Sequence, residues 1–321
     1  MNTHSPQARV AAPCPLCGQS APFRITMPID SMTFRKVDLG SIFNCQHCNF
    51  GFIWPRPSPQ QLSTFYELDE YYTHGASGST APNPGFLSKG RIHLAWRADK
   101  GQSLLDTVST HLPVGGTIVD IGCGDGSLIR ELAIRGFRPI GVERDLWSAA
   151  LRSSSVPVLE GSAENLPNAL ERSAYDAVVF SHVLEHLADP VTAVRNAMAL
   201  LKPGGRLICE VPNNESAIAL QSGISWHHLD VPRHINFFTR KSLQLLLEQA
   251  GLQFRQTTFS GYCRYFSDAY IATEQHIFDH LPHKEGAARN STMRSWLLLA
   301  RTAFAPSERK YDAVGAIAVN G

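Results

Sequence analysis

The feature that most constrains the fold is an apolar segment that runs directly into alternating glycines. Residues 117–121 have the composition of a buried strand that carries Asp120, and Gly122, Gly124 and Gly126 follow it. Glycine lacks a Cβ and tolerates positive φ, so the backbone there can approach a ligand closely. The N–H groups at the start of the next helix then face that ligand. The pattern predicts a ligand-binding turn between a strand and a helix.

A second short strand is expected to end in an acid. The segment from Pro139 to Glu143 is apolar until its last residue, which lies seventeen positions after Gly126. An acid at the end of the second strand of a nucleotide-binding α/β fold accepts hydrogen bonds from ribose hydroxyls. We therefore expect Glu143 to bind a ribose, with Arg144 beside it in the same site.

Four sequence blocks, taken together, resemble the class I S-adenosylmethionine (SAM)-dependent methyltransferases. The glycine turn resembles their motif I, and Glu143 matches their ribose-binding acid. Residues 161–167 resemble the loop that holds the adenine, and residues 175–186 resemble the fourth strand and its turn. Residues 201–207 resemble the turn into the fifth strand. Four blocks in this order are much more specific than one glycine turn.

The resemblance implies an α/β fold with a Rossmann-like seven-stranded sheet, and SAM as cofactor. Tyr71 and Tyr72 match a tyrosine pair that relatives place near the methionyl end of SAM, although packing at a helix end is the alternative. The other residues that we expect to bind the cofactor are Asp120, Gly122, Cys123, Gly124, Glu143, Arg144, Ser162, Ala163, Glu164 and Ser181.

Four cysteines form the second strong signal. Cys14 and Cys17 make one C-x-x-C pair, and Cys45 and Cys48 make another after a gap of 27 residues. Two such pairs complete a closed shell of four thiolates, which is the usual structural zinc site. A redox role is the weaker alternative, because neither pair opens a helix after a βα pattern. A closed shell leaves no coordination position for chemistry, so the zinc is expected to stabilise the fold.

Composition sets milder limits. The 321 residues carry a formal net charge of only +1, so the chain as a whole lacks the positive charge that would attract nucleic acid. No apolar run approaches the roughly 20 residues that span a bilayer, so no membrane partner is expected. Residues 1–12 lack the apolar centre of a signal peptide, and a cytoplasmic location is the resulting expectation.

The chain is expected to divide into three parts. Residues 1–57 form the zinc ribbon with a disordered N-terminus, and residues 58–112 form a helical linker and cap. Residues 113–321 form the SAM-binding domain, with a helical insertion at 262–305 before the last strand. In the family this last strand, here residues 313–319, runs antiparallel beside the sixth.

Helix signals in the linker are clear. Ser58 is the expected N-cap and Pro59 the first residue of a helix to Tyr72. A second, continuous helix is expected from Lys89 to Leu112.

Two histidines are the candidate catalytic residues. His182 follows the fourth strand, and ligands of open α/β sheets bind outside the carboxyl ends of strands. It is expected to act as a base or to line the SAM pocket. His234 lies in residues 226–239, which are dense in ionisable and aromatic groups, and it is the first candidate for a base or an acceptor-orienting group. Glu185 and His186 are interpreted as a structural feature of the helix start, with a catalytic role for His186 as the weaker alternative.

The segment around His234 resembles one in zinc-ribbon methyltransferases that act on nucleotide-linked deoxysugars. In those proteins a Glu-His pair precedes an aromatic-rich stretch. His234 matches the histidine, and Arg233 stands at the position of the glutamate. Aromatic and histidine side chains in the 262–305 insertion are expected to cap the acceptor or to form a dimer contact, and a membrane-surface helix is a weaker alternative.

Three functional classes remain after these observations. The first is a methyltransferase with a small-molecule acceptor, such as a sugar, a polyketide or another secondary metabolite. The second is a methyltransferase that acts on RNA or protein presented by the zinc ribbon, although the basic residues near the ribbon are few. The third is a binding protein that has lost catalysis, which the intact glycine turn and ribose acid disfavour. A homodimer is left open.

Overall fold

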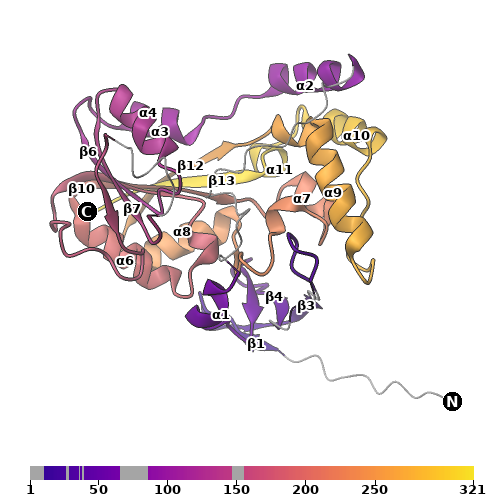
Figure 1. Ribbon diagram of the computed structural model, residues 1–321, viewed down its shortest axis with the longest axis horizontal. Helices are drawn as coiled ribbons and strands as arrows, with labels where there is room; N and C mark the ends of the chain where they lie inside the picture. Colours follow the sequence, from indigo (N-terminus) through magenta and orange to yellow (C-terminus); the bar gives the residue numbers. More distant parts are fainter. Residues whose placement is uncertain (1–10, 27–28, 36, 38–39, 66–85, 147–154) are drawn as a thin grey trace.

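A seven-stranded sheet occupies the centre of the molecule, and a smaller sheet lies beside it (Figure 1). The computed structural model describes residues 11–26, 29–35, 37, 40–65, 86–146 and 155–321. Among these residues, no helix has both the length and the apolar character needed to cross a membrane.

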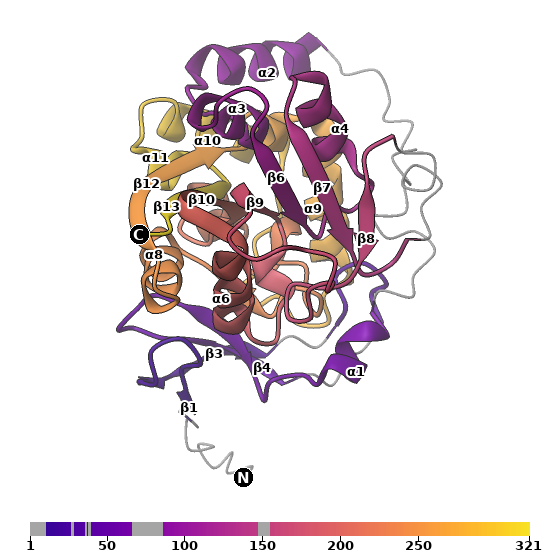
Figure 2. The ribbon, with the colours of Figure 1, turned by 90° about the vertical axis from the view of Figure 1, so that its left-hand side faces the viewer.

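The large sheet has the expected seven strands, in the order β12-β13-β10-β9-β6-β7-β8. Its inner strands are parallel, and β13 runs antiparallel to both β10 and β12, which confirms the predicted final strand. Figure 2 shows β6, β7 and β8 side by side at one edge. The bounds are β6 Thr117–Ile121, β7 Arg138–Glu143, β8 Val158–Glu160, β9 Tyr175–Ser181, β10 Leu201–Pro212, β12 Gln253–Ser260 and β13 Ala313–Val319.

Both faces of this sheet are buried. Along β9, Val178 and Phe180 belong to the core on the face of helices α6 (Pro190–Leu200) and α8 (Arg240–Gln249). The alternate residue Val179 belongs to a second core on the opposite face, where α3 (Leu104–His111) and α4 (Ser127–Ile134) pack. Burial on both faces explains why the strands are continuous apolar runs without alternation.

A four-stranded sheet of order β11-β5-β4-β3 carries the N-terminal part of the chain. Three of its strands are N-terminal, but β11 comes from the segment after β10 and pairs antiparallel with β5. Arg56 joins the two parts further, because its guanidinium donates to the main-chain oxygens of Leu187, Ala188 and Ile235. The bounds are β3 Phe23–Thr26, β4 Ser41–Asn44, β5 Gly51–Trp54 and β11 Asn236–Phe237, and a hairpin of β1 Ala12–Pro13 and β2 Ser20–Ala21 precedes them.

The linker differs from its sequence prediction in two respects. Helix α1 (Pro59–Ser63) begins at the predicted Ser58 cap but ends at Ser63, so the expected helix to Tyr72 is wrong at residues 64 and 65, which form a turn; residues 66–72 lie outside the described residues. The prediction of one continuous helix over residues 89–112 is also wrong. The segment forms two helices, α2 (Phe86–Ala98) and α3, which are separated by residues 99–103.

The break between α2 and α3 has a tertiary cause. The N–H of Lys100 donates to the Tyr311 hydroxyl at 2.8 Å, and the N–H of Gln102 donates to the main-chain oxygen of Phe259 at 3.1 Å. A Cβ on Gly101 would lie 2.7 Å from the Tyr311 ring. Contacts with β12 and with the residue that follows α11 (Ser307–Lys310) therefore replace the helical hydrogen bonds here.

The 262–305 insertion packs onto the segment that follows β10. Tyr262, Tyr265 and Phe266 are fully buried in a core that also contains Trp226. Aromatic residues at the start of the insertion are therefore core residues. Its helices are α9 Asp268–His280 and α10 Thr292–Thr302; α11 (Ser307–Lys310) follows, and α7 (Ala217–Ser222) lies in the segment after β10.

Candidate functional site

The glycine turn adopts the conformation that its sequence predicts. Gly122, Gly124 and Gly126 have φ values of +75°, +56° and +77°. A Cβ on Gly122 would lie 2.5 Å from Cγ2 of Val183, in the turn after β9. Glycine is required at Gly122 both for its left-handed backbone and for this close approach.

Glu143 holds the turn in place. Its Oε2 accepts a hydrogen bond from the N–H of Gly124 at 2.8 Å, and its Oε1 accepts one from the N–H of Arg144 at 2.8 Å. A carboxylate oxygen has capacity for more than one donor. Glu143 can therefore fix the glycine turn and still accept hydrogen bonds from a ligand.

Asp120 is a buried acid with an unsatisfied oxygen. Its side chain is 1% exposed, and Oδ1 has no hydrogen-bond partner among the described residues. Burial first, and then the nearby charge of Glu143, raise the pKa of Asp120 to about 7. Leaving a buried polar atom unpaired costs about 1–3 kcal/mol, so the site suits a ligand that brings a positive charge or a donor.

The predicted adenine loop lies beside Glu143. The N–H of Gly161 donates to the main-chain oxygen of Glu143 at 3.0 Å. Within the loop, Ser162 Oγ accepts from the N–H of Asn165, Ala163 is buried, and Glu164 accepts from the N–H of Asp189. These hydrogen bonds order the loop at the carboxyl edge of β8.

A cavity of about 440 Å³ brings together several predicted residues. Glu143, Arg144 and the loop 162–164 lie outside its lining, and Tyr71 and Tyr72 lie outside the described residues. The predicted residues that line it are Asp120, Gly122, Cys123, Gly124, Ser181, His182 and His234.

His182 lies between two carboxylates at the end of β9. Its φ of +54° is unusual for a residue with a side chain, and such strain persists where surrounding contacts hold it. Nδ1 lies 3.2 Å from Glu185 Oε1, and Nε2 lies 3.4 Å from Glu210 Oε1. Burial alone would lower the pKa of His182, but the hydrogen bonds and charges of the two acids outweigh it and raise the pKa to about 10.

His234 is the opposite case, a neutral imidazole. Its Nδ1 lies 3.0 Å from the main-chain oxygen of His228, which can only accept. The ring therefore donates from Nδ1 and carries its lone pair on Nε2. Burial, and then the charge of neighbouring His186, lower the pKa of His234 to about 4 against the opposing effect of Asp230 and Glu185.

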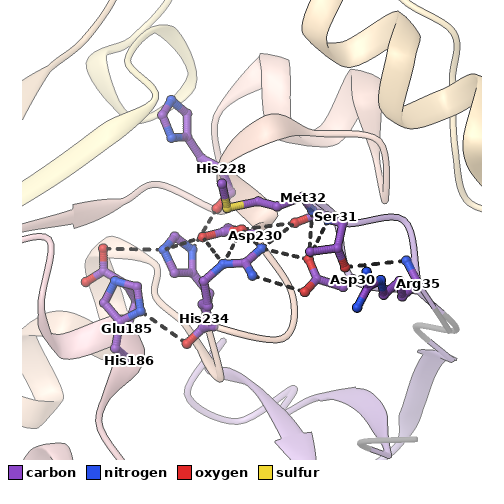
Figure 3. Close-up of polar contacts among 11 residues, drawn as sticks. Asp30, Ser31, Met32, Arg35, Glu185, His186, His228, Asp230 and His234 are labelled. Carbon is purple, nitrogen blue, oxygen red and sulfur yellow. Dashed lines mark hydrogen bonds and ion pairs between the residues drawn. The ribbon is translucent and has the colours of Figure 1, made fainter. Parts of the chain in front are cut away.

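A buried ion network fixes the loop that carries His234 (Figure 3). The Arg233 guanidinium is fully buried and donates to Asp230 and to Asp30, which lies in the N-terminal part of the chain. The N–H of His234 also donates to the main-chain oxygen of Asp230 at 2.9 Å. Arg233 therefore has a structural role in this loop.

Sequence reasoning missed part of the cavity wall. Arg264, from the insertion, lines the cavity and forms two hydrogen bonds with Asp312, at 2.6 and 2.7 Å. Glu210, at the end of β10, and Glu185 hold His182. The position of Glu210 at a strand end was the available signal for that residue, whereas no local pattern marks Arg264.

The four cysteines converge as predicted. All four sulfurs lie within 4.8 Å of one another, with Cys14 and Cys48 sulfurs 3.7 Å apart and those of Cys17 and Cys45 3.5 Å apart. Two thiolates on one tetrahedral zinc ion lie about 3.8 Å apart, since each Zn–S bond is about 2.3 Å. The spacing fits such an ion.

Comparison with known proteins identifies a family for the middle of the chain. Residues 93–257 match the family described as a methyltransferase domain. Ubiquinone biosynthesis O-methyltransferase of Chromobacterium violaceum is 29% identical over 49% of this chain and 74% of its own length. The enzyme of the same name from Aeromonas salmonicida is 30% identical over 51% of this chain and 70% of its own length.

A solved structure supports the fold. The crystal structure of the cyclase SpnF aligns with a TM-score of 0.50 at 18% identity, over 82% of this chain and 96% of that chain. At this identity the likeness concerns the fold alone, and the reaction has to be argued from the site.

Replacing Arg233 by methionine is expected to destabilise the protein strongly. The change leaves Asp30 and Asp230 buried without their shared cation, and breaking a buried pair in this way costs about 3–5 kcal/mol. Urea unfolding of Arg233→Met and of the exposed control Arg35→Met measures the difference. A loss below about 1 kcal/mol for Arg233→Met, or equal losses for both variants, contradicts the structural role assigned to the network.

Proposed function

The chain belongs to the SAM-dependent methyltransferases, and on that premise we propose that it methylates a hydroxyl oxygen of a small-molecule acceptor. The family membership supplies the methyl donor. The oxygen acceptor is supported by the relatives, which are named as O-methyltransferases.

We propose that SAM lies along the glycine turn. Positive φ values and the absence of side chains at Gly122 and Gly124 let the cofactor contact the main chain. Glu143 accepts hydrogen bonds from the ribose hydroxyls, with Arg144 and the loop 162–164 beside the adenine. Asp120, whose Oδ1 has no partner among the described residues, provides a negative charge for the cationic methionyl end.

The acceptor is proposed to occupy the remainder of the cavity, beside His182 and His234. SAM carries an activated methyl group, so the protein has mainly to align the acceptor oxygen with the S–CH₃ bond. His234 lines the cavity, carries its lone pair on Nε2, and is proposed to orient the acceptor hydroxyl. Both ring nitrogens of His182 face carboxylates, which favours a charged pocket-lining role over that of a base.

One observation carries this proposal. Asp120, whose Oδ1 has no partner among the described residues, lines the same cavity as the glycine turn and His234. A cofactor on the turn and an acceptor beside the histidines would therefore share one cavity. Such an arrangement suits a small acceptor that enters the cavity whole.

We also propose that Cys14, Cys17, Cys45 and Cys48 hold a structural zinc ion. The sulfur spacing and the burial of three of the four cysteines support it. A closed thiolate shell contributes folding free energy to a segment with little core of its own. No step of the methyl transfer is assigned to this ion.

The direct test of function is transfer of labelled methyl groups from SAM. The purified protein is incubated with metabolite extract, and the products are separated into small-molecule and polymer fractions. Label in the small-molecule fraction, on an oxygen identified by mass spectrometry, is the expected result. Label confined to RNA or protein contradicts the proposed acceptor class, and label on carbon or nitrogen contradicts the proposed atom.

Glu143→Ala is expected to weaken SAM binding by about 2–3 kcal/mol, because two charge-assisted hydrogen bonds and the support of the turn are lost. Calorimetric titration with SAM measures the change. Glu160→Ala is the matched control, since Glu160 pairs with Glu143 across β7 and β8 but is exposed. Equal affinity in wild type and Glu143→Ala shows that this residue does not bind the cofactor.

Loss of the thiolate site is expected to affect stability before cofactor binding. Cys48→Ala should lower the midpoint of thermal unfolding by roughly 5–10 °C, because a binding free energy of several kcal/mol is lost. SAM affinity at 20 °C or below should remain near the wild-type value. His47→Ala, an exposed neighbour, is the control. An unchanged midpoint in Cys48→Ala rules out a stabilising ion there.

A further inference from the structure

The acceptor part of the cavity is lined by polar side chains. Beyond the glycine turn and the start of α4, the lining residues in the described part of the chain are Ser181, His182, Glu185, His186, His227, His228, Asp230, His234 and Arg264. None of these is aliphatic, and none is phenylalanine, tyrosine or tryptophan. Pockets for hydrocarbon ligands are lined mainly by apolar side chains. This wall therefore suits a hydrophilic acceptor.

Arg264 places a cation with unused donors in this wall. It begins the short turn η4 (Arg264–Phe266), and its Nε and Nη2 donate to Oδ2 and Oδ1 of Asp312 at 2.7 and 2.6 Å. Its Nη1 forms no hydrogen bond in the described part of the chain, and the side chain is 40% exposed and lines the cavity. Burial lowers the pKa of Arg264, but the charge of Asp312 outweighs this effect and raises the pKa, so the group stays charged. The two N–H groups on Nη1 are left for a ligand.

The pair of Arg264 and Asp312 is enclosed by the backbone. A Cβ on Gly261, whose φ is +80°, would lie 2.0 Å from Oδ1 of Asp312 and 2.7 Å from Nη2 of Arg264. The pair therefore fills the space that a side chain at position 261 would take. A guanidinium that is fixed along one edge loses little freedom when its other edge binds a ligand, and such preorganisation favours binding.

His228 adds a neutral polar group beside this cation. Its Nε2 is buried without a hydrogen-bond partner among the described residues, 3.6 Å from Oδ2 of Asp312. Burial, and then the charge of Arg264, lower the pKa of His228 well below its usual value. No hydrogen bond in the described part of the chain fixes the tautomer of this ring, so either nitrogen can carry the proton. An oxygen of a ligand that accepts this proton would remove the cost of an unpaired buried group.

The other acids close to this position already have partners. Glu210 accepts a hydrogen bond on Oε2, and its Oε1 lies 3.4 Å from Nε2 of the charged His182. Both oxygens of Asp230 accept from Nε of Arg233 at 3.1 Å. These carboxylates therefore do not need Arg264 as a counterion, and its Nη1 edge remains available.

The charge of the wall favours a monoanion over a dianion. Among the described residues, Oδ1 of Asp120 and Oε2 of Glu185 are buried without a partner, and neither acid forms an ion pair with Arg264. Repulsion by these acids is about twice as strong for a dianion, such as a phosphate monoester, as for a monoanion at the same position. A carboxylate carries one charge, and its hydrogen bonds to a guanidinium are charge-assisted.

We propose that Arg264 binds a carboxylate of the acceptor through Nη1, beside His228, so that the acceptor is a small hydrophilic hydroxy acid. The assignment rests on the proposed function, because it needs the acceptor hydroxyl to lie at His234. The main-chain oxygen of His228 accepts from Nδ1 of His234 at 3.0 Å, so the two proposed subsites adjoin in one loop. The methyl group passes to the hydroxyl oxygen, which loses its proton, and the carboxylate is unchanged. Asp312 is the positioning residue for Arg264.

The test uses the full-length protein, labelled SAM and pretreated samples of metabolite extract. Amidation of the carboxylic acids in the extract, with carbodiimide and methylamine, should lower small-molecule labelling by at least about 10-fold. Pretreatment with alkaline phosphatase should leave labelling unchanged. The labelled product from untreated extract should be retained by an anion exchanger at pH 7.

Arg264→Gln should lower the labelling rate at limiting extract by about 10- to 100-fold and leave the SAM affinity unchanged. Arg264→Gln/Asp312→Asn, which leaves no buried carboxylate without its cation, should show the same loss. Arg289→Gln is the matched control, because Arg289 lies in the same insertion and pairs with Asp279 outside the cavity lining. On amidated extract, wild type and the Arg264 variants should label at equal rates, which a merely structural role of Arg264 does not predict.

Three results overturn the inference. A labelled small molecule that is neutral or cationic at pH 7 does so with wild type alone, whether or not the variants fold. Labelling that survives amidation, or that disappears after phosphatase treatment, has the same meaning. So does an Arg264 variant that labels untreated extract at the wild-type rate. Label confined to polymer is a different failure, because it contradicts the proposed function itself and the inference falls with it.

Discussion

The hydrogen bonds between Glu143 and the glycine turn are the interaction on which the site depends. They join the ends of β6 and β7, and so place the N–H groups of the turn at the carboxyl edge of the sheet. Gly122 can follow this path only because it lacks a Cβ, which would meet Val183 from the turn after β9. The ends of β6, β7 and β9 are thereby packed together at this edge of the sheet. His182 and Glu185 come directly after β9 and lie at the same edge.

The opposite wall depends on contacts between distant parts of the chain. Strand β11 extends the small N-terminal sheet, and Arg233 pairs with Asp30 across 203 positions in the sequence. These contacts hold the loop that carries His234 against the end of β9. The N-terminal part of the chain therefore supports the cavity, which gives the proposed structural zinc ion an indirect effect on the site without any part in the chemistry.

Sequence alone predicted what is local. The glycine turn, the acid at the end of β7, the cap at Ser58 and the four-cysteine cluster depend on short patterns, and the structure contains each of them. The prediction of a continuous helix over residues 89–112 was wrong because Tyr311 and Phe259 accept hydrogen bonds from backbone N–H groups within that segment.

Groups defined by tertiary contacts were harder to foresee. The pairing of Arg233 with Asp30 and the meeting of Glu185 and His186 with His234 join segments that have no sequence signal for one another. Sequence reasoning interpreted Glu185 and His186 as a structural feature of a helix start, and only the tertiary fold brings them close to His234.

The most direct test of the account is a crystal structure with S-adenosylhomocysteine, the demethylated product of SAM. We expect the nucleoside to lie against Gly122 and Gly124, with its ribose hydroxyls donating to Glu143 and its sulfur facing the cavity beside His182 and His234. A product molecule bound elsewhere, or a glycine turn left without ligand at saturating concentration, would contradict the central claim.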